Sequence, residues 1–567
     1  MTINYPTFLN KVDQITSMCD ANALKSFIHE FARTVPESNR EKFLTTLNDF
    51  CNINEDAHIR KKELDSNLEE HIDSILEALE EIQKGDRELE AEINEEWDDW
   101  YNGDTDADAY NFSDSDDILY DISTATELLH KSLDHENYEK GAELARILSE
   151  LKVHVSGEYL GGTLGIEKLI YYNLLNIDLE KTVKEALYLV CMGSKEQDRG
   201  EAMLTIMDNF GFYNVSLDEI LQMGAHEIDL NYLLPLWINA LAKRPAKISD
   251  DLLEEAQNML QDKKAVLDNA SRYAENHPTL YRNILAIKDE SPEELLLIGL
   301  RGMNEVPINS KIRSDICILT AKYALEIQNQ KTAEYCWLEA FRSSPTIKNY
   351  FQIRFQSENW ENYANKVKDI YSSYYTSKDS WEKKSLAALM FFDERFDEMI
   401  SKFMKAGNGI GWSSSFMKGG IALMLLLLDS GETKGSGISE MIEIALHDCS
   451  FNFDLYREGL DLRDGALIAA KFSECFQKWK SQIVLQQTVC ESWLEKINQW
   501  LALRVSAIME ANRRGCYDEC AAFVAAYGEV LESRGKPGEK ARIMQKYKKD
   551  YSRRRAFHEA LINFGME

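Results

Sequence analysis

Helical periodicity runs through almost the whole chain and constrains the fold more than any other feature. Apolar residues recur three or four positions apart, as in Leu9, Val12 and Ile15, and this spacing places them on one face of a helix. Strand signals are almost absent from the sequence, since no clean alternating run stands between turn dipeptides. Only 9 of the 567 residues are proline and 28 are glycine, which excludes collagen-like and proline-rich chains. The pattern predicts an all-α fold.

A single long helix is expected over residues 57–97. Its apolar positions form a narrow stripe, while the other faces are rich in glutamate, so the helix buries one seam and leaves the rest in water. We expect the seam to pack against the protein's own core, with a dimeric coiled coil as the alternative. The stripe consists of Ile59, Leu64, Leu68, Ile72, Ile75, Leu76, Leu79 and Ile82.

Antiparallel helix pairs are expected from residue 118 to 404. In the clearest pair, residues 311–345, two helices flank a break near Asn329, and Pro345 ends the second helix. Ala333 and Ala340 are small enough to let the two helices approach closely. The length and the Ala…Ala-Phe…Pro ending resemble a tetratricopeptide unit. This resemblance implies a degenerate helical-repeat solenoid, in which each pair covers the apolar face of its neighbour.

Residues 405–437 interrupt the helical pattern. Eight of the 28 glycines fall in this stretch, and a glycine cluster is typical of a loop or hinge. Within it, the eight residues Ile421–Leu428 are the most apolar run of the chain. The run is far shorter than the roughly 20 residues that span a bilayer, so we expect a short, buried helix. We expect a domain boundary at 405–420 and helices from 438 to the end.

These features divide the chain into four expected regions. They are an acidic N-terminal helical region at 1–117 with an acidic loop at 98–117, a helix-pair array at 118–404, a glycine-rich hinge with its short helix at 405–437, and a C-terminal helical domain with a basic tail at 438–567.

Charge is distributed unevenly along the chain. The net charge is −32, and residues 1–150 hold 37 acidic and 13 basic side chains, which is −24. This balance argues against the whole chain being a nucleic-acid or membrane-surface binder. An acidic segment is usually a solvated face or an interaction surface, and we name Asp104, Asp106 and Asp108 as candidate partner-binding residues. Their spacing is that of a calcium loop, but Ala109 and Ser115 stand where such a loop needs glycine and glutamate.

The C-terminal tail has the opposite charge. Arg534 to Glu567 holds ten basic and four acidic residues. Cations interleaved with aromatic rings can hold phosphates and stack bases, so RNA binding through the tail is an alternative function. We favour a helix end docked against an acidic surface and expect no nucleic-acid partner. The candidate partner-binding residues are Lys548, Lys549, Arg553, Arg554 and Arg555, with Tyr547, Tyr551 and Phe557 beside them.

No local pattern indicates catalysis, and we expect no metal ion and no cofactor. Gly407, Gly409 and Gly411 follow no expected strand and lack the spacing of a nucleotide-binding loop. The ten cysteines are scattered without a C-x-x-C pair, and no signal peptide is recognisable, which favours a cytoplasmic protein. An enzyme with a dispersed Cys–His or carboxylate site stays as an alternative, because such residues meet only in space.

Two resemblances to known families concern the C-terminal third. The stretch YKKDYSRRRAFHEALINFG, which ends at Gly565, carries a Tyr…Arg-Arg-x-Ala-Phe…Leu…Phe pattern. It resembles the C-terminal helical region of bacterial proteins with a SWIM zinc finger, as does the KGGIALMLLLL segment that begins at Lys418. The C-x-C…C-x-H zinc motif of those proteins is absent here, so this resemblance implies a helical scaffold without a metal function.

The second resemblance is to the protease-cleaved accessory protein of type III-E CRISPR systems. That family consists of helical, cytoplasmic, non-enzymatic chains of about this size, cut by an RNA-activated caspase-like protease. The resemblance implies a regulatory, protein-binding role in bacterial antiviral signalling, with that protease and a sigma factor as partners. It also implies a cut at a Met–Lys bond that would release 150 residues. The candidate cleavage or hinge residues, within 411–420, are Gly411, Phe416, Met417, Lys418, Gly419 and Gly420.

Overall fold

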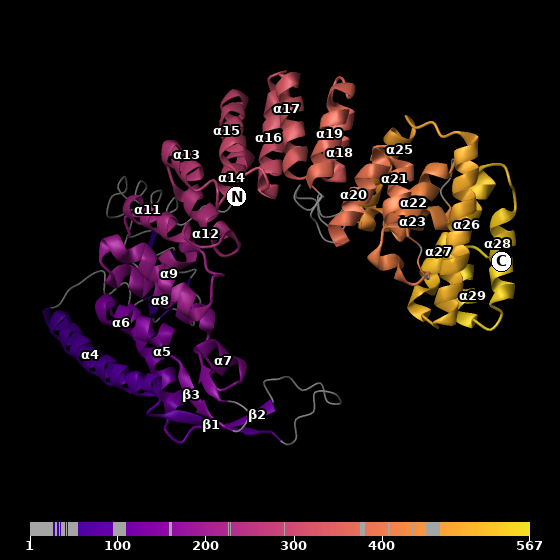
Figure 1. Ribbon diagram of the computed structural model, residues 1–567. Helices are drawn as coiled ribbons and strands as arrows, with labels where there is room; N and C mark the ends of the chain where they lie inside the picture. The colour runs from indigo at the N-terminus through magenta and orange to yellow at the C-terminus, as the bar shows by residue number, and fades with distance from the viewer. Residues whose placement is uncertain are drawn as a thin grey trace. The chain divides into compact units, whose positions relative to one another are not determined.

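The structure is a computed structural model of the whole chain. It describes residues 27–28, 31–32, 35, 40, 42–43, 55–94, 109–157, 161–224, 226, 228–287, 290–374, 380–405, 407, 409–431, 435–449 and 465–566. These residues are mostly helical, which confirms the all-α fold class, and they include one small sheet (Figure 1). The helical face expected from Leu9, Val12 and Ile15 lies outside the described residues. The chain divides into two compact units, Met1–Leu280 and Tyr281–Glu567.

The first unit begins with the acidic helix α4 (Glu55–Lys84). Leu68, Ile72, Leu79 and Ile82 on its apolar seam are buried and pack against α5 and α6 of the same unit. The seam therefore faces the protein's own core, as the stripe predicts. The helices that follow are α5 (Ile118–Asp134), α6 (Tyr138–Glu150), α7 (Ile166–Tyr171), α8 (Leu179–Gly193), α9 (Arg199–Phe210), α10 (Leu217–Leu221), α11 (Leu230–Leu241), α12 (Ala246–Met259) and α13 (Lys263–Arg272).

The prediction of one helix over 57–97 is wrong after Lys84. Gly85 has a φ of +79°, a left-handed conformation that glycine adopts without strain. Its N–H and that of Asp86 donate to the carbonyls of Ile82 and Glu81, which closes the helix. The chain continues as strand β1 (Glu88–Ile93), in which the buried Leu89 and Ala91 alternate with exposed glutamates at positions 88, 90 and 92.

Strand β1 belongs to a four-stranded sheet that the sequence pattern did not predict. The other strands are β2 (Tyr110–Ser113), β3 (Val153–Ser156) and β4 (Gly162–Leu164), in the order β2-β1-β3-β4. β1 runs antiparallel to β2 and parallel to β3, and β4 runs antiparallel to β3. Leu89 is paired with Val155. The strands have three to six residues, too few for a period of two to stand out.

The second unit continues the helical pattern. Its helices are α15 (Pro292–Glu305), α16 (Lys311–Glu326), α17 (Gln330–Ser343), α18 (Ile347–Gln356), α19 (Glu361–Tyr374), α20 (Ser380–Phe392), α21 (Phe396–Phe403), α22 (Met417–Leu428), α23 (Ser436–Asp448), α25 (Gly465–Lys480), α26 (Gln487–Glu510), α27 (Tyr517–Ser533), α28 (Glu539–Asp550) and α29 (Arg555–Asn563). Helix α14 (Thr279–Ile287) lies at the division between the units.

Helices α16 and α17 form the pair expected over 311–345 (Figure 1). Asn329 caps α17 by accepting a hydrogen bond from the Thr332 N–H at 3.2 Å. Ala333 and Ala340 are fully buried where the two helices meet. This pair is confirmed, while its identity as a tetratricopeptide repeat stays a prediction.

The expected domain boundary at 405–420 does not coincide with the division of the chain, which falls between Leu280 and Tyr281. Trp412 and Phe416 are buried inside the second unit, and the Trp412 ring meets the Phe523 ring of α27 at 5.7 Å. The short buried helix over Ile421–Leu428 is confirmed as α22, which begins one turn earlier, at Met417.

Candidate functional site

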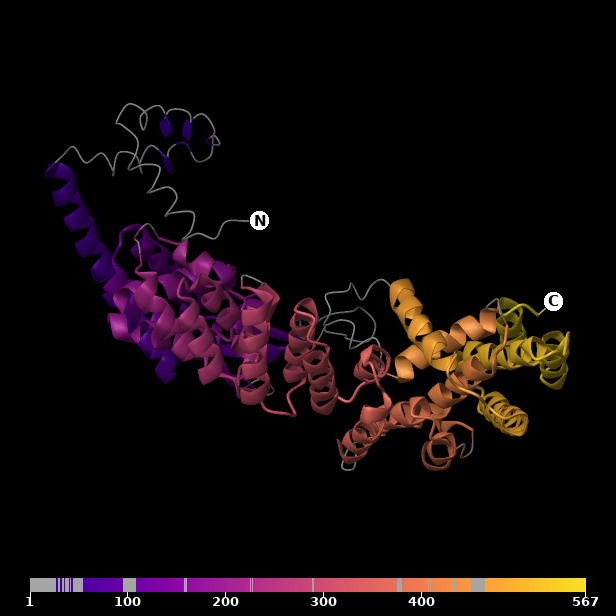
Figure 2. The same ribbon diagram turned by 90° about the horizontal axis from the view of Figure 1, so that it is seen from above.

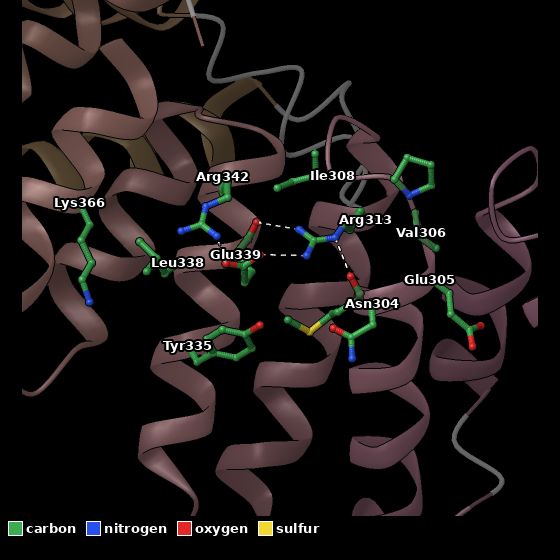
Figure 3. A pocket seen from close by; sticks show the side chains of 12 residues that line it. Asn304, Glu305, Val306, Ile308, Arg313, Tyr335, Leu338, Glu339, Arg342 and Lys366 are labelled. Carbon is green, nitrogen blue, oxygen red and sulfur yellow. Dashed lines mark hydrogen bonds and ion pairs between the residues drawn. The ribbon is translucent and has the colours of Figure 1, made fainter. Parts of the chain in front are cut away.

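A pocket of about 610 Å³ opens between α15, α16, α17 and α19 (Figure 3). Its floor is organised by Arg313 at the start of α16, which is buried. The Arg313 guanidinium donates to the Met303 carbonyl at 2.8 Å, to the Ser343 hydroxyl at 2.6 Å and to the Glu339 carboxylate at 2.9 Å. These bonds join α15, α16 and α17. A buried ion pair of this kind is tolerated because both charges are fully hydrogen-bonded.

The rim of the pocket combines cations with apolar side chains. Arg342 bonds the second Glu339 oxygen at 2.6 Å and stays partly exposed. Lys366 comes from α19, with its ammonium 5.6 Å from the Tyr363 ring. Tyr335 and Ile308 are about half exposed. The rim therefore places cations beside apolar and aromatic side chains.

The thiols of Cys317 and Cys336, beside the pocket, are poor nucleophiles. Burial raises the pKa of Cys336 to about 12 and raises that of Cys317 further. A thiol with such a pKa carries almost no thiolate at neutral pH, and the thiolate is the nucleophile. These two cysteines therefore have a packing role.

A buried Asp–His pair lies in the first unit. His277 is fully buried, with Nδ1 at 2.8 Å from Asp250 and Nε2 at 3.1 Å from the Ala242 carbonyl. Both ring nitrogens are thus engaged, and the geometry is that of a structural histidine rather than a general base.

The segment predicted as a cleavage site is packed rather than looped. Gly411 lies in a 3-10 helix, Gly411–Ser414, and Phe416 stands at the N-cap of α22. Met417, Gly419 and Gly420 are buried in the first turn of α22, while Lys418 is partly exposed. A protease binds its substrate in an extended conformation, so a cut at Met417–Lys418 requires this turn to open.

Tertiary contacts hold the N-terminus of α22. Its N-cap, Phe416, makes no side-chain capping bond. Instead, the Gly419 N–H donates to the Asp448 carboxylate of α23 at 2.9 Å, and the Lys418 ammonium pairs with Glu519 of α27 at 2.7 Å. Asp448 in turn pairs with the buried Lys384 of α20 at 3.0 Å. Opening this turn therefore breaks bonds to other helices.

Arg504 of α26 is the centre of this arrangement. Its side chain is only 2% exposed and donates to Glu519 at 2.8 Å. It also donates to the carbonyls of Gly409 and Ile410 at 2.9 Å and 2.7 Å, and its guanidinium lies 5.3 Å from the Trp412 ring. Arg504 therefore holds the segment before α22 and the carboxylate that binds Lys418.

Arg504 was not predicted as a site residue from the sequence. Its position on α26 carries the available signal: Ile497, Leu501 and Ile508 share the buried face of that helix, and a charged residue on such a face indicates a buried ion pair. The partners, Glu519 and the Gly409 carbonyl, could not be assigned because they lie in other segments.

The basic tail is only partly docked. Arg554 donates to Asn512 Oδ1 and to the Met509 carbonyl, both at 2.6 Å, so it fixes the start of α29 to the end of α26. Lys549, Arg553 and Arg555 are exposed and Lys548 is half-buried. Tyr547 is 8% exposed and Phe557 is fully buried, so these rings pack in the core and cannot stack with bases. Asp104, Asp106 and Asp108 lie outside the described residues.

Three comparisons with known proteins complete this description. Searches of protein-family models, curated proteins and solved structures found no match. Within the described ranges, no group of three or more histidine, cysteine, aspartate or glutamate side chains has a geometry suited to a metal ion. No described helix is both long enough and apolar enough to cross a membrane.

Proposed function

We propose that this chain is a non-enzymatic, protein-binding regulatory scaffold that a protease switches by cutting between Met417 and Lys418. The observation that carries the proposal is the way the first turn of α22 is held. The Asp448 carboxylate accepts the Gly419 N–H and Glu519 pairs with the Lys418 side chain, both from other helices, so a partner that displaces those helices would also expose the Met417–Lys418 bond. The resemblance to the type III-E accessory proteins names an RNA-activated caspase-like protease as the enzyme and a sigma factor as a further partner, in bacterial antiviral signalling.

Local helix energetics support a turn that opens. Gly419 and Gly420 occupy the first turn of α22, and each costs about 1 kcal/mol in a helix relative to alanine. The glycines are required for packing, because a Cβ at Gly419 would lie 2.6 Å from the Asp448 Cβ. The turn therefore has weak intrinsic stability and depends on its neighbours.

The proposed cut also divides the charge of the chain. Residues 418–567 hold 21 basic and 21 acidic side chains, so the whole net charge of −32 belongs to residues 1–417. One product is strongly acidic and the other is neutral with a basic end. The two products would attract different partners.

Aromatic packing would hold the two products together after a cut. The indole N–H of Trp479 donates to the Phe392 carbonyl at 2.8 Å, and its ring lies 5.3 Å from Phe391 and 5.0 Å from Phe392. Phe396 meets Trp493 at 5.0 Å. Separation of the fragments is therefore a second step, which a partner of either fragment could drive.

Co-expression with the protease tests the proposal. The full chain is expressed with the caspase-like protease complex, with and without its activating RNA, and the products are separated under denaturing conditions. We expect two fragments, of 417 and 150 residues, only when the activating RNA is present. An intact chain in the presence of demonstrably active protease contradicts the proposal.

A further inference from the structure

Helices α26 to α29 pack together in the C-terminal part of the chain (Figures 1 and 2). Five exposed cations come from two distant stretches of sequence, the turn after α26 and the segment from the end of α28 to the start of α29, which the hydrogen bonds of Arg554 hold side by side. They are Arg513, Arg514, Lys549, Arg553 and Arg555, and all are exposed; together they are called the basic surface below. Within the described part of the chain, no carboxylate pairs with the first four. Arg555 lies 3.4 Å from Glu559, a pair in which both side chains are more than half exposed.

The basic surface is preformed. The two hydrogen bonds from Arg554 to the Met509 carbonyl and to Asn512 hold the turn after α26 against the turn before α29. Beneath them, the Tyr517 ring of α27 packs on the Phe557 ring of α29 at 5.8 Å. Arg513 and Arg514 follow the first turn directly, while Arg553 and Arg555 flank Arg554. The backbone under these cations is thus ordered before any ligand binds, which reduces the entropic cost of binding.

The chemistry of the surface selects its partner. Arginine forks match carboxylates in a bidentate geometry. A single-stranded nucleic acid would need exposed rings on which bases stack, but Tyr547 and Phe557 are buried, and the partly exposed Tyr551 ring already packs against both of them. The exposed carboxylates of Asp550 and Glu559 flank the cations and limit how many adjacent anions can be held, which favours a short acidic segment over a continuous phosphate backbone.

We propose that the basic surface docks an acidic segment of a partner protein, a short run of aspartate and glutamate side chains. This inference deepens the proposed role of a protein-binding scaffold and rests on it. It assigns partner recognition to the part of the chain that follows the proposed cut. Arg513 and Arg514 join the tail residues as contact residues.

Fluorescence anisotropy on the full chain tests this surface. The probe is fluorescein-labelled decaglutamate, and the variants are R513E/R514E and R553E/R555E. The matched control is K311E/K331E, which reverses two exposed cations on α16 and α17. We expect the wild type and the control to bind equally and each surface variant to bind at least about tenfold more weakly. Binding of the wild type should weaken as salt rises from about 50 to about 300 mM, because the contact is electrostatic.

Two results would overturn the inference. The first is equal binding by the wild type and both surface variants, once circular dichroism has shown that all are folded. The second is strong binding of a duplex or single-stranded oligonucleotide, lost on charge reversal, with no binding of decaglutamate. The cleavage assay on the same variants distinguishes the docking proposal from the proposed cleavage, since the basic surface does not contact the Met417–Lys418 bond. A chain that is cut but binds no peptide refutes only the docking proposal.

Discussion

Replacing Glu519 by glutamine should open the first turn of α22. The Glu519 carboxylate binds the buried Arg504 at 2.8 Å and Lys418 at 2.7 Å. Glutamine keeps the volume of the side chain but removes the charge. Breaking a buried ion pair from one side costs about 3–5 kcal/mol, because the remaining charge stays uncompensated.

The location of the ion pair determines how this penalty is divided between the closed and the opened state of the first turn. When residues 409–418 detach, Arg504 loses its carbonyl partners at Gly409 and Ile410 and can reach water, so the opened state escapes much of the penalty. We expect the free energy of local opening to fall by about 1.4–2.8 kcal/mol, which makes the opened population about tenfold to hundredfold larger.

Glu529→Gln is the matched control. Glu529 lies on the same helix, is similarly buried and pairs with Lys540. Its carboxylate caps α23 by accepting hydrogen bonds from the N–H groups of Gly437 and Ile438 at 3.1 Å and 2.8 Å. Among the described residues Glu529 has no hydrogen bond or ion pair with α22, so its substitution should lower global stability without selectively opening the first turn of α22.

Hydrogen–deuterium exchange followed by mass spectrometry provides the measurement. Peptides that span Met417 to Ile421 should exchange faster in Glu519→Gln than in the wild type and the Glu529→Gln control. Unchanged exchange in Glu519→Gln, or equal acceleration in both variants, would refute the claim that Glu519 holds this turn.

Three further predictions follow from the same contacts. Gly409→Ala should destabilise the second unit by more than the roughly 1 kcal/mol expected for Gly407→Ala. Both glycines have positive φ, but only at Gly409 would a Cβ lie 2.7 Å from a carbonyl oxygen. Urea denaturation measures the two losses of stability, and equal losses would contradict the prediction. The cut wild-type protein should elute from gel filtration as one complex. Trp479→Ala should let the two fragments separate, whereas Trp237→Ala in the first unit should not. Spontaneous separation of the wild-type fragments would show that the aromatic cluster does not hold them together. Burial raises the pKa of the thiols of Cys191, Cys336 and Cys520, so alkylation of the folded chain at about pH 8 should spare them. Rapid labelling of any of these three thiols would contradict their burial.

Features that depend on local periodicity could be predicted from the sequence. The buried helix over Ile421–Leu428, the pair over 311–345 and the inward seam of α4 all follow from apolar spacing within one segment. Strand β1 could not be predicted this way, because glutamates that alternate with Leu89 and Ala91 are also compatible with a helix. The pairing of Leu89 with Val155 also joins residues more than sixty positions apart.

The candidate sites show the same limit. The sequence identified Lys418 and Gly419 as residues in a glycine-rich stretch, which favoured a hinge. The contacts that hold this stretch come from Arg504, Asp448 and Glu519, and nothing in the local pattern specifies such distant partners. The basic tail was recognised by its charge, whereas its union with Arg513 and Arg514 depends on the bonds that Arg554 makes to the turn after α26.

The most direct test of the account is the identity of the new N-terminus after the activated protease has acted on the full chain. N-terminal sequencing of the smaller fragment should read Lys-Gly-Gly-Ile-Ala, which begins at Lys418. A fragment that begins anywhere outside 411–420, or a chain that stays whole beside active protease, would contradict the proposed switch.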